Sequence, residues 1–305
     1  MEYIILDTEW NNSYCRRTGG FVNEIIEIGA VKLDSGLNEI DRFQCIIKSQ
    51  LTKRLSTRFK TLTHITNEEM CHGVSLEEAV DRYVEWMGED CLTLTWSNSD
   101  IYTLLTNFKL FKNTISIPLI KKYADLQAFV QNHLRKNGFQ ISSQISLSNA
   151  AKLLNISTED VELHRAVDDS ALAAEILRKT FNKKQLMSYV IDTENSDYFA
   201  RLMFKPYYIS NINNPMINKN NLRFRCSTCN RFGRQVTSWK FKNRSFKAKF
   251  YCKRCDCSFY GNLAFKRLFD KVVMVKHFNT PILPQGDISN TSVTAEPVIL
   301  QNNVK

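Results

Sequence analysis

The strongest constraint on the fold is a change of pattern partway along the 305 residues. Up to about residue 182, short apolar segments alternate with segments whose apolar residues recur at helical spacing. Residues 209–221 (ISNINNPMINKNN) are then so rich in asparagine that they indicate an exposed connection. Beyond them, basic residues alternate with apolar or aromatic ones. We therefore predict four parts: an α/β domain at 1–182, a linker region at 183–222, a small β domain at 223–277 and a tail at 278–305.

Strands and helices alternate in the first part. Apolar runs predict strands at 3–6, 24–33, 43–47 and 91–96, and the first three are close enough in sequence to form antiparallel pairs. Ser75 is a candidate cap for a helix that follows it. Further helices are predicted at 100–108, 125–134, 146–154 and 166–181. The pattern predicts a mixed sheet between two helical layers, a three-layer α/β fold.

The overall composition is that of an ordinary globular protein, with 43% hydrophobic residues. No apolar run approaches the roughly 18 residues that a membrane span needs, so we expect no membrane contact. The N-terminal segment has an acidic second residue and no basic stretch before its short apolar run, which favours a cytoplasmic protein. The tail at 278–305 has too little apolar material to pack, and we expect it to be disordered.

Charge is divided unevenly along the chain. Residues 201–276 hold 18 lysines and arginines but only two acids, a net charge of +16, so the rest of this +10 chain carries −6. Such a concentration of positive charge suggests contact with a polyanion such as nucleic acid, although a merely solvated basic surface is the alternative.

Two Cys-x-x-Cys pairs lie within this basic region. Cys226 and Cys229 form the first pair, and Cys252 and Cys255 form the second. Four thiolates at this spacing predict one structural Zn²⁺ in a zinc ribbon, with disulfides as the alternative. Cys257 is a second candidate for the fourth ligand, but Cys255 is favoured because Cys-x-x-Cys fits a knuckle turn.

Cations interleaved with aromatic residues surround these cysteines. Neutralisation of phosphates together with stacking on aromatic rings holds single strands without sequence preference. Some of the aromatic residues must instead pack the small core of the domain. The candidate nucleic-acid contacts are Arg223, Arg225, Arg231, Arg234, Trp239, Lys240, Lys242, Arg244, Lys247 and Lys249.

Candidate metal ligands lie in the α/β part. Asp7 and Glu9 follow the first apolar run, and the two-residue period of a strand puts both on one face, about 7 Å apart. Hard oxygen ligands of this kind suit Mg²⁺ or Mn²⁺, although two acids at an exposed strand end would look the same. Asp100 stands at a predicted helix start, where a capping role is the alternative. His164 and Asp169 lie five residues apart, and both can face one cleft if His164 precedes the helix.

In this order, Asp7-x-Glu9, Asp100 and His164 with Asp169 resemble the DEDDh exonucleases, a DnaQ/RNase T-like group with a ribonuclease H-like core. Three further stretches are similar to that family: IIEIGAV at 25–31, LTHIT at 62–66 and HRAVDDSALAA at 164–174. Within the family, TWSNSD at 95–100 and YADLQ at 123–127 resemble the Eri-like and KapD-like branch, whose members include RNA-trimming enzymes.

The resemblance implies a two-metal phosphodiester hydrolase. Asp7 would bridge both ions, Glu9 and Asp169 would hold the ion that binds the attacking water, and Asp100 would support the second ion. His164 would take the proton from that water.

Two nearby residues qualify this assignment. The sister group has a tyrosine four residues before the last aspartate, and that position here is Arg165. The five-residue spacing from the histidine selects Asp169 over the adjacent Asp168.

We therefore expect a 3′-to-5′ exonuclease with two catalytic Mg²⁺ or Mn²⁺ ions, acting on single-stranded nucleic acid, with RNA slightly favoured over DNA. Its zinc ribbon would bind the substrate. The alternative is a catalytically inactive adaptor that binds nucleic acid or regulates a partner through the same folds. The sequence identifies no protein partner.

Overall fold

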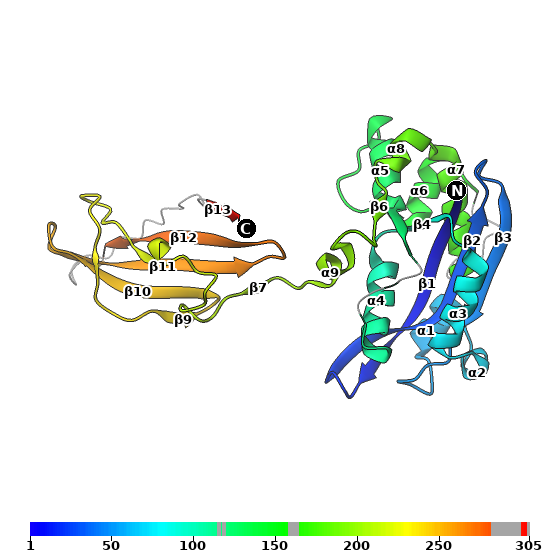
Figure 1. Ribbon diagram of the computed structural model, residues 1–305, viewed down its shortest axis with the longest axis horizontal. Coiled ribbons are helices and arrows are strands. Elements are labelled where there is room, and N and C mark those ends of the chain that lie inside the picture. The colour runs from blue at the N-terminus through cyan, green and yellow to red at the C-terminus, as the bar shows by residue number, and fades with distance from the viewer. Residues whose placement is uncertain (115–116, 118–119, 158–164, 282–299, 304–305) are drawn as a thin grey trace. The chain divides into compact units, whose positions relative to one another are not determined.

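The computed structural model describes residues 1–114, 117, 120–157, 165–281 and 300–303. They belong to two compact units, Met1–Met203 and Phe204–Lys305. Figure 1 shows the elements of both units. Within the described ranges, no helix is long and apolar enough to cross a lipid bilayer.

The first unit is built on a mixed six-stranded sheet in the order β3-β2-β1-β4-β5-β6. Antiparallel pairs join β1 to β2, β2 to β3 and β5 to β6, whereas β4 runs parallel to both β1 and β5. The strands are β1 (Glu2–Cys15), β2 (Gly20–Leu33), β3 (Glu39–Ile46), β4 (Cys91–Thr95), β5 (Lys122–Asp125) and β6 (Ile191–Asp192).

Helices cover both faces of this sheet, which confirms the predicted three-layer α/β fold (Figure 1). Along β1, Tyr3 and Ile5 pack with α5, α6 and α7, whereas Ile4 and Leu6 pack with α3 and α4. The two-residue period of the strand therefore supplies both cores. The helices are α1 (Thr57–Thr63), α2 (Asn67–His72), α3 (Leu76–Met87), α4 (Ser99–Phe111), α5 (Leu126–Lys136), α6 (Leu147–Leu153), α7 (Ala166–Thr180), α8 (Lys183–Met187) and α9 (Tyr198–Met203).

Side-chain caps begin α3 and α5, two of the predicted helices. The Ser75 hydroxyl accepts a hydrogen bond from the Glu78 amide at 3.1 Å at the start of α3. The Asp125 carboxylate accepts one from the Ala128 amide at 2.9 Å at the start of α5. These bonds satisfy amides that have no partner within the helix. The short helices α1 and α2 were not predicted.

The first strand is longer than predicted. It was expected to end at Asp7 and Glu9, but β1 continues to Cys15 because it forms a long hairpin with β2. Polar side chains of this extension bond to the partner strand: the Asn12 amide donates to Asn23 at 3.0 Å, and the Ser13 hydroxyl donates to Glu24 at 3.1 Å. Asp7 and Glu9 therefore lie in the middle of a strand.

The predicted linker region at 183–222 is divided between the two units. Its first half forms α8, β6 and α9, and β6 extends the first sheet through β5. Its second half includes β7 (Tyr207–Tyr208), which pairs with β11 (Cys257–Arg267), and the short 3-10 helix η1 (Lys219–Leu222). The asparagine-rich composition predicted an exposed connection but did not show these pairings.

The second unit contains a seven-stranded antiparallel sheet. It includes the two cysteine pairs, which the sequence placed in a small β domain. Its core includes Phe224, Phe246, Phe250, Phe259 and Phe265. Of the tail predicted to be disordered, residues 282–299 and 304–305 lie outside the described residues. Besides β7, the strands are β8 (Arg234–Gln235), β9 (Lys240–Lys242), β10 (Ser245–Cys252), β11 (Cys257–Arg267), β12 (Lys271–Pro281) and β13 (Leu300–Asn303).

Gly29 in β2 allows α7 to lie directly on the sheet. A β-carbon at this position would be 2.2 Å from the backbone nitrogen of Val167 and 2.3 Å from the carbonyl carbon of Ala166. The Ser170 hydroxyl also donates to the Gly29 carbonyl at 3.2 Å. No larger residue fits without moving the first turn of α7.

We expect Gly29→Ala to destabilise the protein by about 1–3 kcal/mol, the usual cost of overpacking. Gly20→Ala is a matched control in the same strand, because a β-carbon there meets no atom within 4 Å. Urea unfolding measures both. Equal stability of the two variants would contradict the close contact between α7 and β2.

Candidate active site

Asp7 and Glu9 project from β1 just beyond the end of β4. The parallel register between these strands stops at Ile5, opposite Leu94. The alternation of β1 places Asp7 and Glu9 on the same side as Tyr3 and Ile5, which pack with α7. Both carboxylates therefore lie on the side of the sheet that α7 covers.

Asp169 reaches the same place from the first turn of α7. One carboxylate oxygen from each of Asp7, Glu9 and Asp169 lies within 4.8 Å of the other two. An ion with metal–oxygen distances of about 2.1 Å places opposite ligands about 4.2 Å apart, so this spacing fits one Mg²⁺ or Mn²⁺. The structure thus brings together three of the four predicted acidic ligands.

Asp100, the fourth, approaches from the other side of the sheet. It is buried near the start of α4, and its Oδ1 accepts hydrogen bonds from the amide and the hydroxyl of Thr8, at 3.1 and 2.8 Å. Thr8 lies between the two acids of β1 and points to the opposite face. Sequence reasoning did not identify Thr8, because a threonine in a strand gives no signal of its own.

Crowding of these acids opposes their ionisation. Burial, followed by the charges of Asp100, Glu9 and Asp169, raises the pKa of Asp7 well above its ordinary value. Burial and then Asp169 raise the pKa of Glu9 to about 8, and burial raises that of Asp100 to about 7. A bound divalent cation would remove this repulsion, which is the electrostatic reason for a metal at this site.

His164, the predicted base, lies outside the described residues. The next residue, Arg165, is described and precedes the first turn of α7. Asp168 is also described, and it does not belong to the carboxylate group that contains Asp169. The geometry therefore favours Asp169 over Asp168, as the five-residue spacing predicted.

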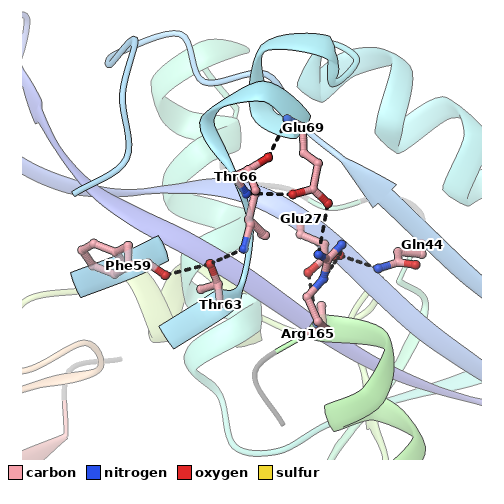
Figure 2. Close-up of polar contacts among 9 residues, drawn as sticks. Glu27, Gln44, Phe59, Thr63, Thr66, Glu69 and Arg165 are labelled. Atoms are coloured by element: carbon pink, nitrogen blue, oxygen red, sulfur yellow. Dashed lines mark hydrogen bonds and ion pairs between the residues drawn. The ribbon is translucent and has the colours of Figure 1, made fainter. Parts of the chain in front are cut away.

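A buried ion pair holds the start of α7 to the sheet (Figure 2). Glu27, fully buried in β2, accepts hydrogen bonds from the Arg165 guanidinium at 2.9 and 3.1 Å and from the Ala166 amide at 3.1 Å. Gln44 of β3 donates to the same carboxylate at 2.7 Å. These contacts give Glu27 a structural role, because they fix the turn that carries Asp169.

Arg165 also contacts the first turn of α2. Its Nη1 lies 3.3 Å from a carboxylate oxygen of Glu69, whose side chain forms a capping box with Thr66 (Figure 2). One guanidinium thus joins β2, α2 and α7. No sequence signal predicted this pairing, since its members are 138 and 96 residues apart.

The four predicted zinc ligands come together in the second unit. The sulfur atoms of Cys226, Cys229, Cys252 and Cys255 lie within 4.8 Å of one another. A tetrahedral zinc site with Zn–S bonds of about 2.3 Å has sulfurs about 3.8 Å apart, so the cluster fits Zn²⁺. Cys257 Sγ is also only 3.8 Å from Cys226 Sγ, so the alternative ligand lies at the same cluster. Although burial opposes it, hydrogen bonds from the Cys229 and Thr228 amides lower the pKa of Cys226 to about 6.

The structure separates the aromatic residues around this cluster. Phe224, Phe246 and Phe250 are buried, and Trp239 is half-buried with its ring against Phe224 and Phe250. Trp239, predicted as a nucleic-acid contact, therefore belongs to the packing of the core. The exposed Phe232 has two guanidinium groups above its ring: those of Arg223 and Arg225, at 4.1 and 4.0 Å from its centroid.

Comparison with known proteins supports the exonuclease interpretation of the first unit. Residues 4–177 match the RNase_T family, which is described as an exonuclease family. The PolC-type DNA polymerase III of Clostridium perfringens (strain 13 / Type A) is 27% identical over 209 residues, 67% of this chain but 13% of that protein. That of Thermotoga petrophila is 24% identical over 190 residues, covering 61% and 13%. This chain thus spans a small part of the length of these relatives.

Solved structures share the fold. The nuclease domain of 3′hExo, a DEDDh family member bound to rAMP, has a TM-score of 0.50 at 24% identity, covering 57% of this chain and 88% of that one. Cell-death related nuclease 4 has a TM-score of 0.51 at 18% identity, covering 58% and 62%. At these identities the likeness concerns the fold, and it confirms the α/β exonuclease core.

Without metal, the first unit should lose stability as pH rises. Glu9 has an ordinary pKa of 4.5 and a folded-state pKa of about 8, so between these values the folded state holds a proton that the unfolded state releases. We expect the thermal midpoint in metal-free buffer to fall from pH 5 to pH 8, by about 2–4 °C for each 1 kcal/mol lost. Mn²⁺ should reverse most of the fall, and Glu9→Gln should reduce it. A midpoint that rises over this range would contradict the crowded carboxylates.

Removal of the Arg165 guanidinium should be costly. We expect Arg165→Gln to lower the free energy of unfolding by about 3–5 kcal/mol, because it leaves the buried Glu27 charge without its cation. Glu69→Gln, at the more exposed end of the same guanidinium, should cost less than about 1 kcal/mol. Urea unfolding of both variants tests the difference, and equal losses would show that Glu27 does not depend on this pair.

Proposed function

This chain belongs to the RNase T family of exonucleases, and we propose that it removes nucleotides from the 3′ end of nucleic acid with the help of divalent metal ions. The observation that carries the proposal is the convergence of the Asp7, Glu9 and Asp169 carboxylates within 4.8 Å, inside the matched region. Asp100 adds a fourth carboxylate close enough to raise the pKa of Asp7. The residues present fit a site for two hard cations.

The chain's own residues supply the ligands and hold them in place. Asp7, Glu9, Asp169 and Asp100 would bind two Mg²⁺ or Mn²⁺ ions, which together activate a water, stabilise charge on the phosphate and assist the leaving 3′ oxygen. Thr8 orients Asp100 through two hydrogen bonds. We assign to His164 the removal of the proton from the attacking water, since its unperturbed pKa near 6.5 suits a base at neutral pH.

We further propose a single-stranded substrate, with RNA favoured over DNA. The motifs similar to the Eri-like and KapD-like branch support RNA, because that branch includes RNA-trimming enzymes. Parallel degradation assays on matched RNA and DNA strands decide between the two. The competing hypothesis, an inactive adaptor, is disfavoured because every acidic position of the motif is occupied by a carboxylate.

The second unit is proposed to bind the substrate, with Zn²⁺ as its structural metal. The strands that cover its small aromatic core meet at the cysteines. Cys252, the last residue of β10, is paired with Cys257, the first residue of β11. Metal bound here would contribute directly to the folding of the unit.

Asp7→Ala should reduce the release of mononucleotides from a 3′-labelled strand in Mn²⁺ by at least about 100-fold. The loss of metal-based charge stabilisation is worth several kcal/mol, and each 1.4 kcal/mol is a tenfold change in rate. EDTA should have the same effect, and added Mn²⁺ should restore the activity. Asp168→Asn is the neighbouring control and should remain active. Undiminished release by Asp7→Ala would exclude this site as the catalytic centre.

Cys226→Ser should abolish the binding of one equivalent of Zn²⁺ and unfold the second unit. Cys257→Ser should still bind one equivalent of Zn²⁺ and should keep the second unit folded. Metal analysis of the purified variants and their far-ultraviolet circular dichroism measure these effects. Loss of zinc from Cys257→Ser but not from Cys255→Ser would assign the fourth ligand to Cys257.

A further inference from the structure

The strands around β10 present one face that carries cations and tyrosines. Phe246 and Phe250 of β10 are buried, so Lys247, Lys249 and Tyr251 point to the opposite side of the sheet. Directly opposed residues of an antiparallel pair share a face. We call this surface the basic face; it consists of Arg234, Lys240, Lys242, Lys247, Lys249, Tyr251 and Tyr260.

The register places like charges next to each other on this face. Lys240 of β9 is paired with Lys247 of β10, and Lys242 and Lys249 follow on the same side. Like charges directly opposite each other destabilise a sheet. Among the described residues, no carboxylate forms an ion pair with any cation of the basic face. The sheet therefore carries a like-charge pair that no carboxylate of the described residues neutralises.

Acids are too few to relieve it. The stretch 201–276 has only Asp256 and Asp270, and the Asp256 carboxylate accepts the Tyr251 hydroxyl at 2.5 Å. A polyanion laid across the face would neutralise the lysine pair and release counterions. Charge complementarity thus favours a polyanion as the partner of this face.

The tyrosines favour a single strand over a duplex. Tyr260 lies opposite Lys249, and the Lys247 ammonium sits 4.1 Å from the centroid of its ring. Aromatic rings next to cations let unpaired bases stack while the backbone contacts the charges. Bases in a duplex are already stacked on one another, so these rings would add little to its binding.

We propose that the basic face is the surface on which this protein binds a single-stranded nucleic acid. The proposal rests on the proposed function in that the bound strand is the substrate to be shortened. It selects five of the ten predicted contacts and adds Tyr251 and Tyr260, which were not among them. It leaves out Trp239, whose ring packs against the core.

The test measures binding by the full chain in an Asp7→Ala background, so that no chelator disturbs the zinc site. Fluorescence anisotropy of a 5′-labelled single strand is recorded over a range of salt concentrations. Lys240→Gln with Lys247→Gln removes two contacts, and the slope of log K against log salt should decrease in magnitude by about 1.4, at about 0.7 for each contact. Lys205→Gln with Lys219→Gln removes the same charge outside the strands of the face and should leave the slope unchanged.

Two further measurements exclude trivial causes. Tyr260→Ala should weaken binding to a single strand by about fivefold or more, with Tyr260→Phe close to the parent. The thermal stability of the double lysine variant should not fall, because the substitution removes a repulsion. Weaker binding by a protein at least as stable cannot result from unfolding.

Three results would overturn the proposal: a parental slope for the lysine variant, equal weakening by the control pair, or complete displacement of the strand by an acidic peptide at matched charge. Failure of the proposed function is a separate outcome. A strand that binds through this face but is never shortened by the parent chain in Mn²⁺ would contradict the exonuclease alone. If the parent chain shortens the strand but the basic-face variants bind it as tightly as the parent does, only the proposed binding surface would be contradicted.

Discussion

The close contact between the first turn of α7 and Gly29 determines the geometry of the candidate active site. Asp7 is paired with Gly29 across the β1–β2 hairpin, so the helix that rests on the glycine starts beside the carboxylate. Glu27 lies two residues earlier on the same strand. Its carboxylate accepts hydrogen bonds from the Ala166 amide and the Arg165 guanidinium. A single strand thus sets both how near α7 comes and where its first turn begins. Asp169 joins Asp7 and Glu9 as a result.

Each unit concentrates charge of one sign in one place: negative at the carboxylate group of the first unit and positive on the basic face of the second. Burial and then the charge of Asp169 raise the pKa of Glu9 to about 8, although the Arg165 cation acts in the opposite direction. On β9 and β10, Lys240 faces Lys247 without a carboxylate partner. In both places the folded chain carries an unfavourable interaction that a ligand of opposite charge would relieve. These clusters of like charge make the folded protein less stable than neutral residues at the same positions would, which is typical of binding sites.

Local patterns predicted the acids, the cysteines and most of the elements. Asp7 and Glu9 share a face because of the strand period alone, and the helix caps at Ser75 and Asp125 are short-range signals. The length of β1 was missed because its polar residues interrupt the apolar pattern, and the bond from Asn12 to Asn23 exists only once the hairpin has formed. The Arg165–Glu27 pair and the division of the aromatic residues between core and surface depend on tertiary packing and register. Neither the ion pair nor this division of the aromatic residues produces a periodic pattern in the sequence.

The division of labour among the acids has an evolutionary consequence. Glu27 and Arg165 maintain the architecture, so selection for a folded protein retains them whether or not a strand is ever cut. Asp7 and Glu9 oppose folding until a cation arrives, so a lineage that gave up hydrolysis would gain by replacing them. In descendants of such a protein, drift at Asp7 and Glu9 would mark lost catalysis, and survival of the Glu27–Arg165 pair would carry no information about it.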